Sequence, residues 1–428
     1  MTSKLFLSFL ALACLAPLRA DTIFLGDRDL QQVLDAAPPH AVIQCDPNRT
    51  LLVSTALRIR RPLTLIGLHA RLPEKLGRAK ILVVESPGVA VLDFDFTGNG
   101  DSVPQTERAP LMTVIAGDFR IERGRFSNSS KDGLMITCGA DKQDVVGGVV
   151  RDIVGRNVKR DTVSIGGGDD GARVRNVLVD NVRAYGSELR GAVEVSDGSD
   201  NITVRKVYAE GCSYAVDVQD HKKPGQINRN VVIEDVYAVG CKQGIVTNNR
   251  RLGHLNLTIR DVTVQDCAVP LRISHTDNLQ LSNIRILGEG GQGGLALTRE
   301  QQDAPLLHLL DCRGVTVRDL VVENTTRRAP ALLIEDCNEV LVDGVRVQGA
   351  KTQLTHAVSY RLTTPETFSG LRIANVVARN LAGSGIALER VGKKPGALTD
   401  YRIVGNLATV EDNIKGARAV VADNLTTP

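Results

Sequence analysis

Carboxylate, imidazole and guanidinium side chains recur at matching places in successive segments of the chain between residues 189 and 276. Glu194 precedes Asp197 by three residues, and Asp217 precedes Asp220 by the same interval. Paired carboxylates can act as general acids and bases or bind a divalent cation. The candidate set comprises Glu194, Asp197, Tyr214, Asp217, Asp220, His221, Lys222, Asn248, Asn249, Arg250, Arg272 and His275.

These groups suit the removal of a proton next to the carboxyl group of a uronate sugar. That reaction needs a base, a proton donor for the leaving oxygen and positive charge on the substrate carboxylate. Arginine and lysine can supply the charge, and so can Ca²⁺ held by several carboxylates. Four neighbouring carboxylates repel one another unless one is protonated or a cation lies between them. We therefore expect a calcium ion as the cofactor.

We assign each candidate a role by its chemistry, with Asp217 and Asp220 at the centre. Arg272 or Arg250 would bind the substrate carboxylate or act as the base. The predicted catalytic residues are Tyr214, Asp217, Asp220, His221, Arg250 and Arg272. The predicted calcium ligands are Glu194, Asp197, Asp217 and Asp220. The predicted substrate-binding residues are Glu194, Lys222, Asn248, Asn249 and His275. The alternative is that such carboxylates are solvated surface residues that pair with nearby cations.

The elements that position these residues are repeats. A polar residue, often Asn, precedes alternating apolar positions, and 25 residues separate Asn176 from Asn201. Between these elements lie short segments that alternate with a period of two, such as 193–195 and 216–218. A period of two is the signature of a half-buried strand. Short strands in repeating units, with almost no helical periodicity, predict an all-β parallel β-helix whose coils stack on one another.

Stacking turns the sequence register into columns of side chains. The middle residues of the short strands are predicted to form an outward column of Met135, Ser164, Glu194, Asp217, Val246, Arg272, Ala296 and Leu333. The next outward column is predicted to be Thr137, Gly166, Ser196, Gln219, Asn248, Ser274, Thr298 and Glu335. Cys212, Cys241 and Cys267 share one register position, and we predict a stack of buried thiols there in place of disulfides.

The two ends of the chain have their own signals. A basic start and a 14-residue apolar run from Leu5 to Leu18 predict a signal peptide over residues 1–20. That run is too short to cross a bilayer, and no later segment is long and apolar enough. The spacing of apolar residues over 29–37 predicts a short helix that caps the first coil, with Asp29 as its N-cap. We assign residues 21–428 to one β-helix domain.

Composition restricts the partners. The net charge is +3, and Lys4 and Arg19 in the predicted signal peptide contribute two of those charges, so nucleic acid is not expected. Trp is absent and aromatic residues are 3% of the chain, which weakens any proposal that neutral sugars stack on broad aromatic surfaces. We expect an acidic polysaccharide as the partner, no membrane span and a monomer.

The repeat pattern resembles the pectate-lyase-like right-handed β-helix proteins over nearly the whole mature chain. The resemblance implies a single-stranded right-handed parallel β-helix. The segment 214–221, Tyr-Ala-Val-Asp-Val-Gln-Asp-His, is similar to the Tyr-Gly-Phe-Asp-Pro-His-Asp motif of mannuronan C5-epimerases. By position, Tyr214, Asp217 and Asp220 match that motif, which implies that they face a uronate. The family's His falls on Gln219 here, and His221 lies two residues further on.

Two classes of function follow from these observations. The first is a secreted or periplasmic enzyme that cleaves an acidic, uronate-containing polysaccharide by β-elimination. A glycoside hydrolase or a C5-epimerase on the same fold is a variant of that hypothesis, since carboxylates on adjacent coils could lie near the ~5 Å separation of a retaining glycosidase. The second class is a non-catalytic surface, adhesion or glycan-binding β-helix, which repetition alone supports equally well.

Overall fold

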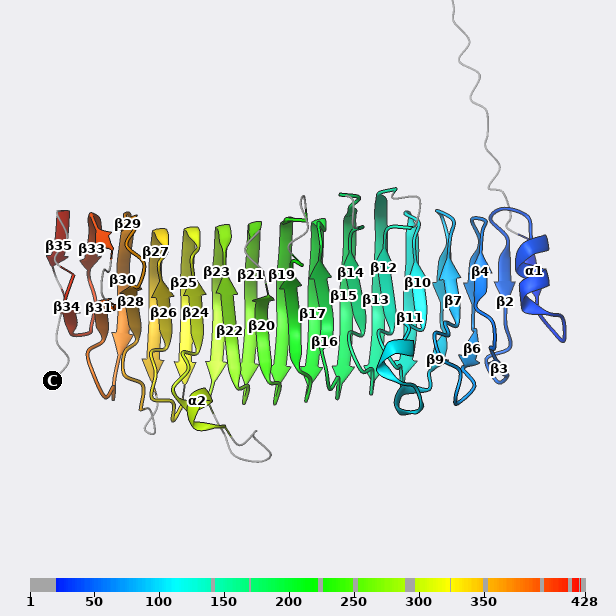
Figure 1. The fold of residues 1–428 in the computed structure, drawn as a ribbon, viewed down its shortest axis with the longest axis horizontal. Helices are drawn as coiled ribbons and strands as arrows, with labels where there is room; N and C mark the ends of the chain where they lie inside the picture. Colours follow the sequence, from blue (N-terminus) through cyan, green and yellow to red (C-terminus); the bar gives the residue numbers. More distant parts are fainter. Residues whose placement is uncertain are drawn as a thin grey trace, which may run out of the picture.

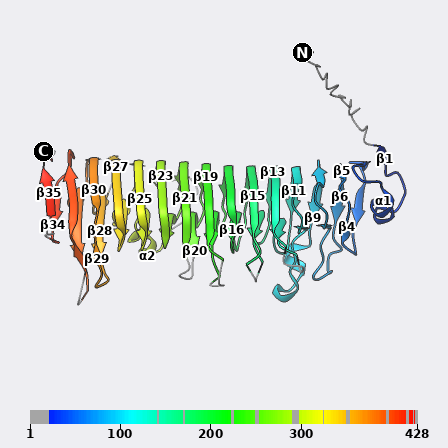
Figure 2. The same cartoon turned by 90° about the horizontal axis from the view of Figure 1, so that it is seen from above.

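In the computed structural model, the described residues are 21–139, 143–168, 171–221, 226–248, 253–288, 297–323, 325–348, 353–392, 396–414, 418–422 and 424. Within them the chain winds into a stack of β coils, with β1 and α1 at one end and β34 and β35 at the other (Figures 1 and 2). All strand pairings among the described residues are parallel, so each coil adds a strand to the edge left by the previous coil. The prediction of a parallel β-helix is confirmed.

Most coils contribute one short strand and one long strand. The short strands form a 14-stranded sheet within the described residues, called sheet B here. Its strands are β4 (Leu57–Ile59), β7 (Leu82–Val84), β10 (Met112–Val114), β12 (Leu134–Thr137), β14 (Val163–Gly166), β16 (Gly191–Ser196), β18 (Tyr214–Gln219), β20 (Gln243–Asn248), β22 (Val269–Ser274), β24 (Leu307–Leu310), β26 (Leu332–Glu335), β28 (Val358–Leu362), β31 (Ile386–Arg390) and β34 (Val410–Asp412).

The remaining long and short strands form a 19-stranded sheet in the same part of the chain, called sheet A here. Its strands are β1 (Thr22–Phe24), β2 (Val42–Gln44), β3 (Thr50–Leu52), β5 (Thr64–Ile66), β6 (His69–Arg71), β8 (Ala90–Leu92), β9 (Asp95–Thr97), β11 (Phe119–Ser127), β13 (Val145–Arg156), β15 (Val174–Tyr185), β17 (Asp200–Glu210), β19 (Asn228–Val239), β21 (His254–Gln265), β23 (Thr276–Leu287), β25 (Arg313–Glu323), β27 (Asn338–Gln348), β30 (Leu371–Ala378), β33 (Asp400–Val404) and β35 (Arg418–Ala422). A separate pair joins β29 (Thr367–Phe368) to β32 (Ala397–Leu398).

Asparagines stack along one corner of the coils. Asn176, Asn201, Asn230 and Asn256 all have a positive φ, a conformation that Asn tolerates better than most residues. The Nδ2 group of Asn201 donates to Oδ1 of Asn176 at 2.8 Å, and Asn256 donates to Asn230 in the same way. The recurring Asn of the sequence therefore marks a turn in the chain and an amide ladder that joins neighbouring coils.

Aliphatic side chains fill the interior of the stack. On β16 and β18 the side chains of Val193, Val195, Val216 and Val218 are completely buried in the core. The cysteine prediction is also confirmed, because Cys212, Cys241 and Cys267 are free and buried. Since Val, Ile and Leu pack well on a pleated surface, this core needs few aromatic residues.

Helix α1 (Leu30–Ala36) covers the first coils, as the sequence predicted (Figure 1). The side chain of Asp29 accepts a hydrogen bond from the backbone N–H of Gln32 at 2.9 Å and caps the helix. The side chain of Gln31 then bonds to both backbone groups of Arg58 in β4. A second helix, α2 (Arg299–Gln302), and two 3-10 turns, Gly100–Ser102 and Gln105–Glu107, interrupt the coils.

One predicted strand does not take its predicted place in sheet B. The segment 295–297 alternates like a short strand, but the sheet-B strand of that coil is β24, in which His308 pairs with Arg272. Leu310 takes the place predicted for Thr298, and Thr298 is the N-cap of α2. Ala296 and the predicted signal peptide, residues 1–20, lie outside the described residues. None of the described helices is long and apolar enough to cross a membrane.

Candidate functional site

The strand register of sheet B brings the predicted carboxylates into one column. Ser164 pairs with Glu194, and Glu194 pairs with Asp217 on the next coil. The column continues through Val246 to Arg272. The predicted outward column is therefore correct from β12 to β22, and it continues through His308 of β24 in place of Ala296.

The carboxylates of this column are covered, although the register places them outside the apolar core. Glu194 is 2% exposed, Asp217 is 1% exposed and Asp220 is completely buried. They are therefore not the solvated surface residues of the alternative interpretation. Direct contact between a polymer and Asp217 or Asp220 would require the groups that cover them to move. The catalytic roles of both residues therefore stay predictions.

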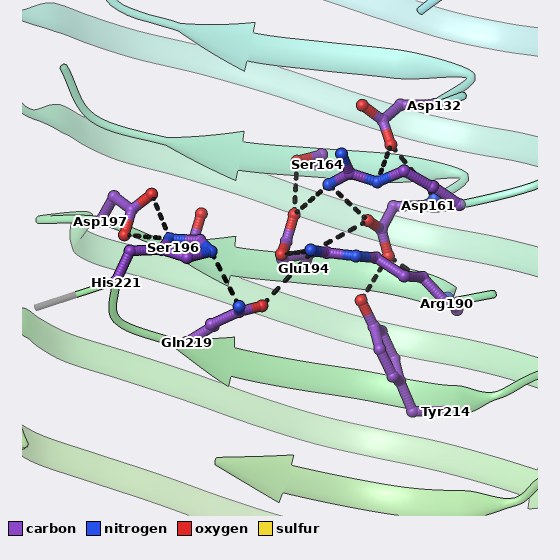
Figure 3. A network of polar contacts seen from close by, with 12 residues as sticks. Asp132, Asp161, Ser164, Arg190, Glu194, Ser196, Asp197, Tyr214, Gln219 and His221 are labelled. Carbon is purple, nitrogen blue, oxygen red and sulfur yellow. Dashed lines mark hydrogen bonds and ion pairs between the residues drawn. The ribbon is translucent and has the colours of Figure 1, made fainter. Parts of the chain in front are cut away.

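Two arginines that the sequence analysis missed neutralise Glu194 (Figure 3). The Nη1 group of Arg190 donates to one carboxylate oxygen of Glu194, and Arg160 lies 3.6 Å from the other. The hydroxyl of Ser164 donates to that second oxygen at 2.8 Å. Glu194 thus has opposite charges and a hydrogen-bond donor around it, as a buried carboxylate requires.

A second buried carboxylate, Asp161, binds Tyr214 at the other end of the network in Figure 3. The hydroxyl of Tyr214 donates to Oδ1 of Asp161 at 2.6 Å. Burial, and next the charge of Asp132, raise the pKa of Asp161 to about 7, against lowering by Arg190, Tyr214 and Arg160. Burial and the charges of Asp161 and Asp217 raise the pKa of Tyr214 well above its usual value. Tyr214 is consequently a neutral hydrogen-bond donor near neutral pH.

His221 connects this buried network to the surface. Its Nδ1 atom lies 2.7 Å from the Asp197 carboxylate, and its side chain is 31% exposed. Its Nε2 atom lies 2.9 Å from Nε2 of Gln219. Oε1 of Gln219 accepts a hydrogen bond from Arg190 at 3.3 Å. Figure 3 shows this chain from Asp197 through His221 and Gln219 to Arg190.

The partners of His221 determine its tautomer. Because Arg190 can only donate, it fixes the Gln219 amide with its oxygen toward the guanidinium and its NH₂ toward the imidazole. That NH₂ donates to His221 Nε2, which must then carry a lone pair. The proton of the neutral ring is on Nδ1 and points to Asp197. This arrangement leaves an imidazole base with its lone pair away from the carboxylate.

Positive charge lies further along the same sheet. Arg272 is exposed on β22, two coils from Asp217 and roughly 10 Å away by strand spacing. His275 follows β22, and its Nδ1 atom lies 2.8 Å from the carboxylate of Asp311. Both residues therefore lie beyond the buried network, where an extended ligand could contact them.

Several predicted site residues have no described side chain. Lys222, Asn249 and Arg250 lie outside the described residues, so their predicted roles stay predictions. Asn248 ends strand β20 and pairs with Gln219 in the register, so its predicted role in substrate binding stays a prediction.

The calcium prediction finds little support in the charge pairing. Among the described residues no group of three or more His, Cys, Asp or Glu side chains is arranged to hold a metal ion. The Asp197 carboxylate contacts His221, whereas arginines surround Glu194. We therefore assign no calcium ligands, and calcium binding stays a prediction for titration to test.

The missed residues precede the strands of sheet B. Asp132 and Asp161 each lie two residues before a strand-opening aliphatic residue, Leu134 and Val163, which pair in the register. Applying the predicted columns to the turns as well as to the strands would have brought these two carboxylates together. Arg160 and Arg190 adjoin the same turn positions, but the sequence register does not show where their long side chains point.

The described residues define a parallel β-helix, and solved structures of similar fold are known. Three solved structures illustrate the likeness. The family 28 exopolygalacturonase of Yersinia enterocolitica is 11% identical, with a TM-score of 0.48 over 93% of this chain and 79% of that one. The A-module of the mannuronan C-5 epimerase AlgE6 from Azotobacter vinelandii is 13% identical, with a TM-score of 0.45 over 93% of this chain and 94% of that one.

The third structure is a variant of the periplasmic alginate epimerase AlgG, 11% identical, with a TM-score of 0.49 over 92% of this chain and 84% of that one. These likenesses concern the fold alone and carry no argument about activity. No protein-family model matches the sequence, and no curated protein does.

Proposed function

We propose that the protein is an exported enzyme that acts on an acidic, uronate-containing polysaccharide by β-elimination. The polymer would lie along the outer face of sheet B, over His221 and Arg272. The predicted signal peptide over residues 1–20 supports export to the periplasm or beyond the cell. The observation that carries the activity is the half-exposed His221, held by Asp197 and Gln219 with its lone pair on Nε2.

His221 would be the base of this reaction. When substrate binds, the Gln219 amide must move from Nε2, and the freed lone pair takes the proton next to the uronate carboxyl group. The electron pair of the broken C–H bond forms a double bond as the bond to the leaving oxygen breaks. That oxygen takes up a proton. The carboxylate of Asp197 stabilises the imidazolium that forms, as in other Asp–His pairs.

Arg272 would bind the substrate carboxylate. Negative charge builds up on this group when the proton leaves, so a guanidinium placed there stabilises the transition state more than the ground state. Arg160 and Arg190 are not available for this role, because they already pair with Glu194 and Asp161. Their role is to hold Gln219 and the column carboxylates in position.

The test is incubation of the mature protein with a panel of polyuronates, with and without Ca²⁺. Ultraviolet absorbance of unsaturated uronide and the number of reducing ends are followed together. Elimination raises both signals, and His221→Gln should abolish both. Reducing ends alone would indicate a hydrolase and contradict the proposal. Exchange of substrate hydrogen with solvent, with neither signal, would indicate an epimerase.

Two further variants test whether Asp217 is catalytic and whether the protein is an enzyme or a non-catalytic glycan-binding protein. Asp217→Ala tests the centre predicted from sequence, because a catalytic Asp217 would make this variant inactive while it remains folded. Asp277→Asn is the control, since Asp277 is exposed on sheet A, away from the site. If every polyuronate is bound and none is changed, the non-catalytic glycan-binding alternative is correct.

A further inference from the structure

A cavity of about 420 Å³ opens on sheet B near the N-terminal end of the stack. Its walls are the turn 54–56 before β4, the segment 76–80 before β7, and outward side chains of β4, β7 and β10. The strand register joins Arg58 to Val83 and Val83 to Thr113. This is the same outward column that leads to Glu194, so the cavity and the candidate site share one face.

Positive charge exceeds negative charge around this cavity. Arg58, Arg78 and Lys80 line it. Lys80 is half-buried, and burial, followed by the charges of Lys131 and Arg58, lowers its pKa. A lysine placed among other cations in a partly buried position is unfavourable unless an anion joins it.

The acidic residues nearby do not compensate for these cations. Glu85 is the one acidic residue among the described residues that line the cavity. Arg58 donates to its Oε1, and Arg60 donates to its Oε2 at 3.2 Å. Glu107 is exposed, and its carboxylate packs against Gly77 at the rim. Each carboxylate oxygen of Glu85 therefore accepts a hydrogen bond from an arginine. Glu85 compensates the charge of Arg58 and Arg60 and does not compensate that of Lys80.

A buried hydroxyl provides an independent sign of a ligand. Thr113 lines the cavity, is only 3% exposed, and its Oγ1 atom has no hydrogen-bond partner. A buried hydroxyl without a partner costs free energy, which a bound acceptor would recover. The cations and this hydroxyl therefore require the same thing, a group with negatively charged oxygens.

We propose that this cavity binds an anionic group, a carboxylate or sulfate, of an acidic glycan. Naming a glycan rests on the proposed function, whereas the anion site itself rests on Lys80, Arg58 and Thr113. Three coil steps separate Thr113 from Glu194, or roughly 14 Å at the usual strand spacing. A chain bound in the cavity could thus continue along sheet B to His221.

Calorimetric titration of the full mature chain tests the site. The probes are inorganic sulfate, a tetrasaccharide of uronates and a sulfated tetrasaccharide. The oligosaccharides are titrated into the His221→Gln protein, so that turnover does not interfere. We expect Lys80→Gln and Thr113→Val each to weaken oligosaccharide binding about tenfold, since each removes one hydrogen bond to a charged group. The tetrasaccharide that binds more tightly identifies the anionic group.

Lys75→Gln is the matched control, because Lys75 is exposed in the same loop, does not line the cavity and carries the same charge. If Lys75→Gln and Lys80→Gln lose the same oligosaccharide affinity, the loss follows from the lower net charge alone. That result would contradict an anion site in the cavity. Loss of sulfate binding alone, with oligosaccharide binding unchanged, would overturn the glycan assignment. A protein without lyase activity that still shows the Lys80-dependent affinity would contradict the proposed function and leave this site standing.

Discussion

His221 and Asp197 are 24 residues apart in the sequence, yet the imidazole Nδ1 lies 2.7 Å from the Asp197 carboxylate. Each residue follows a sheet-B strand, and the two strands, β16 and β18, are neighbours in the register. Coil stacking therefore brings together the two turns that carry the acid and the imidazole. Gln219, on β18, then fixes the opposite nitrogen of the ring.

Asp197→Asn should therefore reduce turnover without unfolding the protein. An amide can donate to Nδ1, which would favour the tautomer with its proton on Nε2 and remove the lone pair from the base. We expect kcat to fall by roughly 10²- to 10⁴-fold. The measurement is the rate of unsaturated uronide formation, together with the melting temperature.

Asp277→Asn serves as the control for this prediction and should leave both quantities unchanged. A similar rate in Asp197→Asn and the parent protein would show that His221 does not act through the Nδ1 tautomer. A large drop in melting temperature would instead assign a structural role to the Asp197–His221 pair.

The regular coils could be predicted from sequence because stacking repeats one register. The alternation around Glu194 and Asp217 is enough to place both side chains in one outward column, and the structure agrees. The expectation that each alternating segment takes the next place in the outward column failed at residues 295–297, where an apolar alternation follows a glycine-rich segment. Local alternation does not determine which segment of a coil joins the sheet, and β24, which lies further along the chain, pairs with β22.

Burial could not be predicted in the same way. The register placed Glu194 on the outer face, where arginine side chains from the preceding turns and the hydroxyl of Ser164 contact its carboxylate. Arg160 and Arg190 have long, flexible side chains whose direction no strand pattern fixes. The register of the candidate residues could therefore be predicted from sequence, whereas the charge pairing around them and the partial exposure of His221 depended on three-dimensional contacts.

Arg190→Gln should destabilise the fold strongly. The side chain of Arg190 is 23% exposed and lies between Glu194 and Asp161, which are almost completely buried. Its removal leaves buried negative charge with less compensation, which typically costs about 3–5 kcal/mol. Chemical denaturation would measure the change in the free energy of unfolding.

Adding Glu194→Gln should recover part of that loss, because it removes one of the charges left unpaired. Arg318→Gln, an exposed site on sheet A, controls for the loss of one positive charge. Equal effects of Arg190→Gln and Arg318→Gln would mean that the buried network contributes nothing to stability.

His254 should make stability fall in mild acid. This imidazole is 4% exposed, and burial lowers its pKa to about 4, despite the opposing charge of Asp220. Between that value and the ordinary 6.5 the unfolded chain binds the proton more strongly than the folded chain. The contribution of His254 to the free energy of unfolding is therefore fully present above pH 6.5. It is lost as the pH falls toward 4, and the total loss is about 3 kcal/mol.

Unfolding curves between pH 4 and pH 7 for the parent protein and His254→Gln measure this effect. The difference in stability between them should narrow toward pH 4. His40→Asn, which removes an exposed imidazole, controls for the loss of one histidine from the chain. A constant difference between the parent and His254→Gln across the range would contradict the lowered pKa.

The thiols of the core should resist modification until the stack opens. Burial raises the pKa of Cys45 to about 11. The hydrogen bond with Cys212 lowers the pKa of Cys241, but the hydrogen bond with Cys267 and burial outweigh it and raise that pKa to about 12. A thiol with so high a pKa has almost no thiolate at pH 8, and the thiolate is the reactive form. Of the described cysteines, only Cys138 is partly exposed.

A coloured thiol reagent at pH 8 should therefore modify one group quickly in the folded mature protein, and Cys138→Ser should abolish that fast phase. The other described cysteines should react only when denaturant opens the coils, in step with the loss of β-structure. Fast reaction of several thiols in the Cys138→Ser protein would mean that the coils separate readily, and the buried cysteine column would then not describe the protein in solution.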